Sequence, residues 1–213
     1  MIKAPSQEMF AILTLMSSIN PQLYLASTSP RRRELLTSLG LQFDILPIDV
    51  EESRLPTESP QDYVCRVALD KARAGWSHKQ RNQILPVLGS DTEVVRNDHV
   101  FGKPADREDA FRMLSLLSGQ QHQVMSAVAV VEGDREKVLL NTSLVQFRSI
   151  TTDEMQWYWQ TGEPLGKAGG YAIQGKAALF INDLQGSFSA VMGLPLFETG
   201  ELLAEFGVLS MSP

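Results

Sequence analysis

The sequence predicts an α/β protein with a mixed central sheet and flanking helices. Residues 23–26 form a short apolar strand, followed by a Ser/Thr-rich turn, a helix and a second strand-like segment, which is the order of a right-handed parallel unit. Residues 123–132 and 136–149 are two long strands joined at Gly133 and Asp134, a pair typical of an antiparallel hairpin. Parallel and antiparallel strands are therefore expected in one sheet.

Helix boundaries are marked by capping residues. Ser29 is a favoured N-cap, and Gly40 suits the position just after the first helix, which we expect over residues 30–39. Asp106 and Thr151 begin two later helices in the same way, the second with a capping box. Periodicity and turn residues predict helices over residues 60–76 and 195–206, and strands over residues 41–46, 84–89, 92–96, 99–101, 178–182 and 189–192.

Composition narrows the class of partner. The chain has 213 residues, 43% of them hydrophobic and 21% charged, which is ordinary for a globular protein. A net charge of −6 argues against a general binder of nucleic acid or anionic membranes. The single Cys65 excludes an intrachain disulfide and fits a reducing compartment, so a cytoplasmic location is expected.

Residues 1–20 are interpreted as an N-terminal extension, and residues 21–213 as a single domain. The apolar segment 10–16 faintly resembles a signal peptide, but it is too short to span a bilayer and no small-residue cleavage site follows it.

A cluster of three arginines points to an anion site. Residues 31–33 crowd the first helical turn, where the helix dipole is already positive, an arrangement that becomes favourable when an anion binds. Free N–H groups, the hydroxyls of Ser27 and Ser29 and the guanidinium groups can together hold a phosphate or carboxylate. The alternative is three solvated surface arginines.

Two further residues could join this site. Lys71 shares a helix face with Val64 and Val67, where a lysine is costly unless it reaches solvent or meets an anion. Asp91 follows the strand at 84–89, and ligands of α/β folds bind at the carboxyl ends of strands. Lys103 lies nearby in a Gly-Lys-Pro sequence that lacks the Ser or Thr of a P-loop, so that motif is rejected.

The segment 162–175 contains five glycines without the spacing of a dinucleotide site. It is either a ligand-binding loop carrying Lys167 and Gln174 or a plain connector. The three histidines lack metal-ligand spacing, and no serine-hydrolase elbow is present. Glu51, Glu52 and Asp91 remain as oxygen ligands for a hard divalent metal, beside cations that can clamp phosphates. This combination suits metal-assisted attack of water on a polyphosphate.

Seven short motifs, taken in order, resemble the Maf family of nucleoside triphosphate pyrophosphatases from about Leu23 to the C-terminus. They are S-x-S-P-R-R at 27–32, D-V-E-E at 49–52, K-A at 71–72, S-D-T at 90–92, G-K-P at 102–104, K-A-G-x-Y-x-I-Q-G at 167–175 and G-L-P-L at 193–196. The resemblance implies a fold like that of the inosine triphosphate pyrophosphatases, with two lobes around a deep cleft. It also implies hydrolysis of a nucleoside triphosphate to the monophosphate and pyrophosphate with a divalent metal, Mg²⁺ or Mn²⁺.

The resemblance also implies roles for individual residues. Asp91 would accept the proton of the attacking water and, with Glu52, hold the metal. The phosphate-binding residues would be Ser29, Arg32, Lys71 and Lys103, while Arg31, Thr92 and Gln174 are similar to the branch that prefers dTTP and UTP. Ser90 stands where alanine is more usual in the family.

Two alternatives stay open at this point. The chain could act on 7-methyl-GTP like the sister branch, or it could be a nucleotide-binding regulator, since Maf proteins are also associated with inhibition of septum formation. A homodimer is compatible with either activity.

Overall fold

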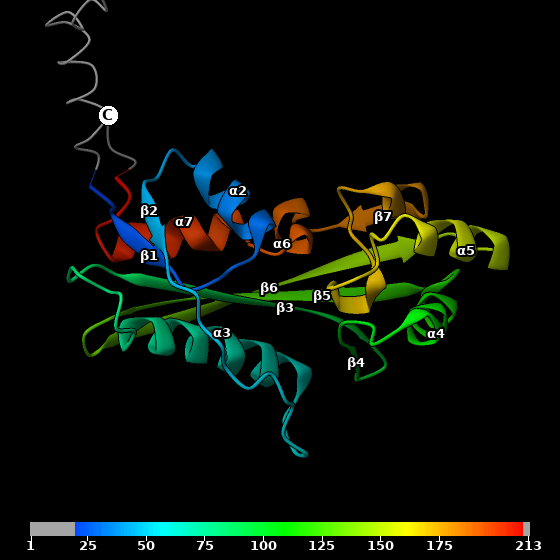
Figure 1. Cartoon of the computed structure of the whole chain (residues 1–213), viewed down its shortest axis with the longest axis horizontal. Helices are drawn as coiled ribbons and strands as arrows, with labels where there is room; N and C mark the ends of the chain where they lie inside the picture. Colours follow the sequence, from blue (N-terminus) through cyan, green and yellow to red (C-terminus); the bar gives the residue numbers. More distant parts are fainter. Residues whose placement is uncertain (1–19, 211–213) are drawn as a thin grey trace, which may run out of the picture.

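The computed structural model describes residues 20–210 and builds them around one seven-stranded mixed sheet (Figure 1). The strand order is β2-β1-β3-β5-β6-β7, and β4 pairs with β3. The strands are β1 Leu23–Leu25, β2 Phe43–Ile45, β3 Val87–Arg96, β4 His99–Phe101, β5 Gln121–Glu132, β6 Arg135–Phe147 and β7 Ile181–Gln185. The helices are α2 Pro30–Ser38, α3 Pro60–Trp76, α4 Arg107–Leu117, α5 Thr152–Gln160, α6 Phe188–Met192 and α7 Leu196–Glu205, with 3₁₀ turns η1 Ala168–Gly170 and η2 Lys176–Leu179. The predicted fold class is confirmed.

The parallel part of the sheet is the unit β1-α2-β2. Leu25 of β1 pairs in parallel with Ile45 of β2 on one side and with Leu88 of β3 on the other. Ser29 occupies the N-cap position of α2, and Gly40 follows the helix with a φ of 75°, a conformation that favours glycine. The predicted strand-helix-strand unit is therefore present.

Three long antiparallel strands, β3, β5 and β6, run through the whole molecule. The β5–β6 hairpin turns at Gly133, as predicted, and α3 has the predicted bounds. Figure 1 shows α3 covering one face of these strands, while α2, α6 and α7 cover the other. The sheet is thus the middle layer of three.

The buried side chains divide the molecule into two lobes along these strands. In one lobe, α4, α5 and the segment around Tyr171 pack on the ends of the strands that carry Val94 and Phe147. In the other, α2 and α7 pack on the part that carries Leu88 and Val130, and α3 packs on the opposite face. The two lobes confirm the expected architecture.

One predicted strand, residues 189–192, is wrong, because this segment belongs to helix α6. The Ser187 side chain accepts a hydrogen bond from the Ala190 N–H at 3.2 Å, and Gly193 ends the helix with a φ of 124°. Over so few residues, a short apolar run such as 190–192 fits one helical turn as well as a strand, and the capping serine decides. The preceding strand begins at Ile181, because residues 178 and 179 lie in η2.

The predicted end of a strand at Gly89 is also wrong. β3 continues through Asp91 to Arg96, and Ile84, which was expected in the strand, is exposed. The polar residues 90–92 do not end β3 because β5 pairs with it along its length, and the hydroxyls of Ser90 and Thr92 find partners at Gly193 and Ser126.

The extension predicted over residues 1–20 lies, apart from Asn20, outside the described residues, as do residues 211–213. Between residues 20 and 210, no helix is both long enough and apolar enough to cross a membrane.

Candidate active site

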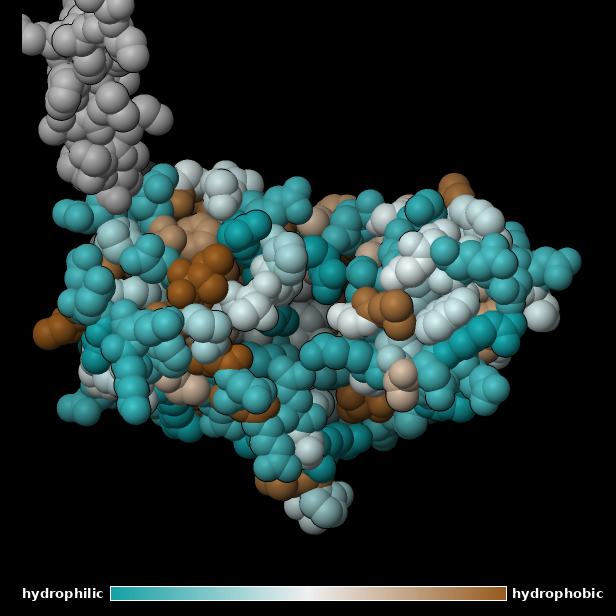
Figure 2. All heavy atoms as spheres, in the orientation of Figure 1, coloured by the Kyte–Doolittle hydropathy of each residue, from teal (hydrophilic) through white to brown (hydrophobic). Residues whose placement is uncertain are grey.

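A cavity of about 440 Å³ opens where the two lobes meet (Figure 2). It lies along one edge of β3, between the part paired with β1 at Val87 and Leu88 and the part paired with β4 from Val94 onward. Because β1 is so short, the middle of β3 is left beside the turn that leads into α2. The middle of β3, which is unpaired on this edge, forms the floor of the cavity.

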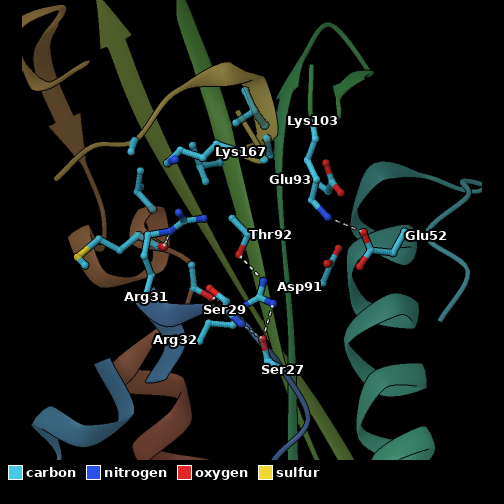
Figure 3. A pocket seen from close by; sticks show the side chains of 18 of the residues that line it. Ser27, Ser29, Arg31, Arg32, Glu52, Asp91, Thr92, Glu93, Lys103 and Lys167 are labelled. Atoms are coloured by element: carbon cyan, nitrogen blue, oxygen red, sulfur yellow. Dashed lines mark hydrogen bonds and ion pairs between the residues drawn. The ribbon is translucent and has the colours of Figure 1, made fainter. Parts of the chain in front are cut away.

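The turn between β1 and α2 contributes the first cations. The Ser29 N–H donates to Ser27 Oγ at 3.2 Å, and the Ser29 side chain caps no helical N–H. Arg32 Nε donates to the Gly193 carbonyl at 2.8 Å, while its Nη2 lies 3.4 Å from Thr92 Oγ1 (Figure 3). Burial lowers the pKa of Arg32. Its guanidinium is therefore fixed in a cavity that favours a bound anion.

The other two arginines of the cluster differ from each other. Arg31 lines the cavity, and its Nε donates to the Met192 carbonyl at 3.2 Å. Arg33 is exposed and is not among the residues that line the cavity. The expected three-arginine site therefore consists of Arg31 and Arg32.

Ion pairs join the remaining charged groups in a row. Lys71 Nζ lies 2.7 Å from Asp91 Oδ1 and 2.6 Å from Glu52 Oε1, and Lys103 Nζ lies 3.0 Å from Glu52 Oε2. Partial burial opposes ionisation of Glu52, but the hydrogen bonds from Lys71 and Lys103 outweigh it and lower its pKa to about 2. The buried Lys71 thus meets an anion, and the solvent-reaching alternative is excluded.

Asp91 reaches this site from the middle of β3 and not from a strand end. Its residue pair across β5 is Ala127, well inside the antiparallel ladder. Asp91 still lies just beyond the end of β1. Ligands of α/β folds bind past the carboxyl ends of parallel strands, and here that strand is β1, whereas β3 was expected from the sequence. Asp91 Oδ2 is buried and has no hydrogen-bond partner within residues 20–210.

Glu93 is a cavity residue that sequence reasoning missed. It is 8% exposed, its Oε2 has no hydrogen-bond partner among the described residues, and Figure 3 places it beyond Asp91 along β3. Burial, together with the charges of Asp91 and Glu52, raises the pKa of Glu93 to about 8. Had β3 been predicted to continue, its two-residue period would have placed both carboxylates on one face.

The glycine-rich segment forms the opposite wall. Its Gly169 N–H donates to the Gly102 carbonyl at 3.1 Å, which ties the segment to the turn carrying Lys103. Lys167, Tyr171 and Gln174 all line the cavity, so the ligand-loop interpretation is favoured over a plain connector. Burial, reinforced by the charge of Arg31, lowers the pKa of Lys167.

The structure brings every predicted site residue to the same cavity. They are Ser29, Arg31, Arg32, Glu52, Lys71, Asp91, Thr92, Lys103 and Gln174. Glu51, considered as a further metal ligand, is exposed and does not line it. No group of three or more His, Cys, Asp or Glu side chains in the described part of the chain has the geometry to hold a metal alone.

Comparison with known proteins agrees with the ordered motifs. A family model described as "Maf-like protein" matches residues 22–206. The chain belongs to this family. The Maf-like match begins after the predicted extension and includes every residue named above for the cavity.

Close relatives extend the comparison over almost the whole chain. A protein of Xanthomonas campestris pv. campestris named dTTP/UTP pyrophosphatase is 54% identical over 187 residues, covering 87% of this Maf-like chain and 98% of the relative. One of Alkalilimnicola ehrlichii with the same name is 50% identical over 191 residues, covering 88% and 94%. Among solved structures, the Staphylococcus aureus Ham1 protein has a TM-score of 0.39 and 14% identity, covering 59% of this chain and 71% of that one, a likeness too low to argue from.

Proposed function

We propose that this Maf-like chain hydrolyses dTTP and UTP to the nucleoside monophosphate and pyrophosphate. The observation that carries the proposal is the row of ion pairs Asp91–Lys71–Glu52–Lys103 beside Arg32, inside one cavity. Cations can neutralise the charge that develops on phosphoryl oxygens, and a carboxylate can accept the proton of the attacking water, so this row carries the groups that phosphoanhydride hydrolysis uses. Relatives at about half identity that are named dTTP/UTP pyrophosphatase support the same substrates.

The cations would bind the triphosphate. Arg32 offers N–H groups in the fork geometry that matches phosphate oxygens, and Ser29 offers a hydroxyl that caps no N–H group of α2. Lys71 and Lys103 now pair with carboxylates, and a phosphate chain would take over part of that pairing. Their charges would neutralise the oxygens on which negative charge develops in the transition state.

Asp91 would accept the proton of the attacking water. Lys71 holds one carboxylate oxygen, and the second, Oδ2, has no hydrogen-bond partner in the described part of the chain. A general base needs this kind of free acceptor within hydrogen-bond reach of its water.

Asp91 and Glu52 would hold the divalent metal, Mg²⁺ or Mn²⁺. Mg²⁺ usually takes one or two protein carboxylates together with water and substrate phosphates, so it does not require a cage of three side chains. Among residues 20–210, Asp91 Oδ2 has no hydrogen-bond partner, so this carboxylate oxygen is open to such an ion. When bound, the metal would polarise a phosphoryl oxygen and offset its charge.

Gln174 would read the base, because its amide carries a donor and an acceptor and it lines the cavity on the wall that carries Lys167. Uracil and thymine both present carbonyls flanking an N3–H, whereas cytosine carries an amine. Arg31 and Thr92 are assigned to the same selectivity by their family resemblance. A cytoplasmic reaction is proposed with it, on the single Cys65.

The direct test is pyrophosphate release from dTTP, UTP, CTP, GTP and 7-methyl-GTP, measured as kcat/KM with Mg²⁺ or Mn²⁺. We expect dTTP and UTP to be the best substrates. Equal rates on all five, or a preference for 7-methyl-GTP, would overturn the substrate assignment. Binding of nucleotide without release from any of them would favour the regulator.

A further inference from the structure

Glu163 lies outside the row of charged groups and does not line the cavity, yet its carboxylate is almost fully hydrogen-bonded. Oε1 accepts from the Tyr158 hydroxyl at 2.8 Å and from the Ala177 N–H at 3.1 Å. Oε2 accepts from the Lys176 N–H at 2.8 Å. One carboxylate therefore ties helix α5 to the start of η2.

These contacts fall directly beside Gln174. A Cβ atom built on Gly175 would lie 2.4 Å from the carboxyl carbon of Glu163, so the carboxylate packs against the backbone at that glycine. Gln174 is the residue before it, and Lys176 and Ala177, which donate to Glu163, follow it. The chain leaving Gln174 is thus held on one side by this carboxylate.

The anchor itself is rigid. Tyr158 is fully buried and meets Phe180 edge to face, with ring centroids 5.3 Å apart. Partial burial of Glu163 favours its neutral form, but the N–H of Lys176, the Tyr158 hydroxyl and the N–H of Ala177 outweigh it and lower its pKa. Ionised Glu163 offers only acceptors, which is what three donors converging on one carboxyl group require.

We propose that Glu163 is the positioning residue for base selectivity, because it fixes the backbone that carries Gln174. This inference rests on the proposed function, in which Gln174 reads the base. Since Ser29, Arg32 and Lys71 lie outside the glycine-rich segment 162–175, at the start of α2 and on α3, a displaced Gln174 would misalign the base and leave the phosphates bound.

Glu163→Gln tests this directly, since it keeps the shape but points an amide donor at a backbone N–H. We expect the ratio of kcat/KM for dTTP over CTP to fall about tenfold, the size of one lost hydrogen bond to a charged group. Inhibition by inorganic tripolyphosphate, which has no base, should be unchanged. Tyr158→Phe removes one of the three donors and should lower the ratio less, and Gly175→Ala should lower it by pushing the carboxylate away.

The matched control is Glu154→Gln, which removes another hydrogen-bonded carboxylate that contacts α5, here at its N-terminus, where Glu154 completes the capping box and pairs with Arg148. It should lower the melting temperature without changing the dTTP:CTP ratio. If Glu163→Gln and Tyr158→Phe only lower the melting temperature, as Glu154→Gln does, Glu163 is merely structural and the inference is wrong. If Glu163→Gln does not fold, the ratio measured on Tyr158→Phe and Gly175→Ala decides alone. A wild-type chain without pyrimidine preference would instead overturn the proposed function, and the premise of this inference with it.

Discussion

Lys71 and Asp91 project into the cavity from regular elements, α3 and β3, whereas Gln174 projects from a segment between two 3₁₀ turns. The first two hold each other through an ion pair. Gln174 owes its position to groups outside the cavity, above all Glu163, which accepts from two backbone N–H groups and the Tyr158 hydroxyl. The phosphate-binding wall, formed by Lys71 and Asp91, is thus held by its own functional side chains. The base-reading wall, the segment that carries Gln174, is held by residues outside the cavity. Substitutions on the two walls should therefore change different properties of the protein.

The largest effect should come from Asp91→Asn, which keeps the shape of the side chain but can no longer accept a proton. A positioned base contributes about 10²–10⁴-fold, so kcat should fall by that factor while nucleotide affinity is largely kept. Turnover is measured by pyrophosphate release and affinity by calorimetry. Asp98→Asn, at the exposed turn after the same strand, is the control. Unchanged turnover would remove Asp91 from the chemistry.

Lys71→Met should have the next largest effect, which is a loss of stability. Removing one partner from a buried ion pair leaves the other charge uncompensated, which typically costs about 3–5 kcal/mol of unfolding free energy. Because Lys71 faces two carboxylates, we expect a loss within that range in urea unfolding. Lys137→Met breaks an exposed pair with Glu205 and should cost about 1 kcal/mol or less. Equal losses in both variants would contradict the idea of a wall held by its own ion pairs.

The stability of the base-reading wall should be the more sensitive to acid. Tyr171, which belongs to this wall, is hydrogen-bonded through its hydroxyl to His122 Nε2 at 2.8 Å. Burial and the charge of Arg96 lower the pKa of His122 to about 4. In the unfolded chain His122 has an ordinary pKa near 6.5 and binds the proton more readily. The free energy of unfolding should therefore fall by about 3 kcal/mol between pH 6.5 and 4.

The measurement is urea unfolding across that pH range. His122→Leu should remove this part of the slope, although it lowers stability at neutral pH. His99→Gln, at an exposed position, should keep the wild-type slope. A slope that survives in His122→Leu would assign the acid sensitivity elsewhere.

Gln174→Ala should affect selectivity only. A polar group of the base left without its partner costs about 1–3 kcal/mol, so discrimination between dTTP and CTP should fall roughly 10- to 100-fold. Inhibition by tripolyphosphate should stay the same, because Ser29, Arg32 and Lys71 lie outside the glycine-rich segment that carries Gln174. Gln185→Ala, on the exposed side of β7, is the control. A weaker tripolyphosphate effect in Gln174→Ala would show that the walls are not separate.

The smallest effect is expected from removing the residues before Gln22. If residues 1–20 are an extension outside the core, the melting temperature and kcat/KM should both stay near those of the full chain. A large loss in either would show that the segment packs on one of the walls.

The phosphate-binding wall could be predicted from the sequence because its signals are local. Pro30 and the arginines after it mark a helix start with an anion site, and Lys71 stands out on an apolar helix face. Glu93 could not be found in the same way, because predicting that β3 continues past Ser90 requires knowing that β5 pairs with it. Glu163 was equally hidden, since two of its three partners are main-chain groups thirteen and fourteen residues later.

The unbroken course of β3, β5 and β6 through both lobes has a consequence for how a nucleotide enters. In proteins whose lobes are joined by flexible linkers, a ligand is admitted by hinge bending. Here a shared, close-packed sheet serves as a common backbone for the two halves, and its ladder of hydrogen bonds resists such bending. We therefore expect a nucleotide to enter through local changes, such as separation of the Glu52–Lys103 ion pair, whose partly exposed side chains water and substrate can part at little cost.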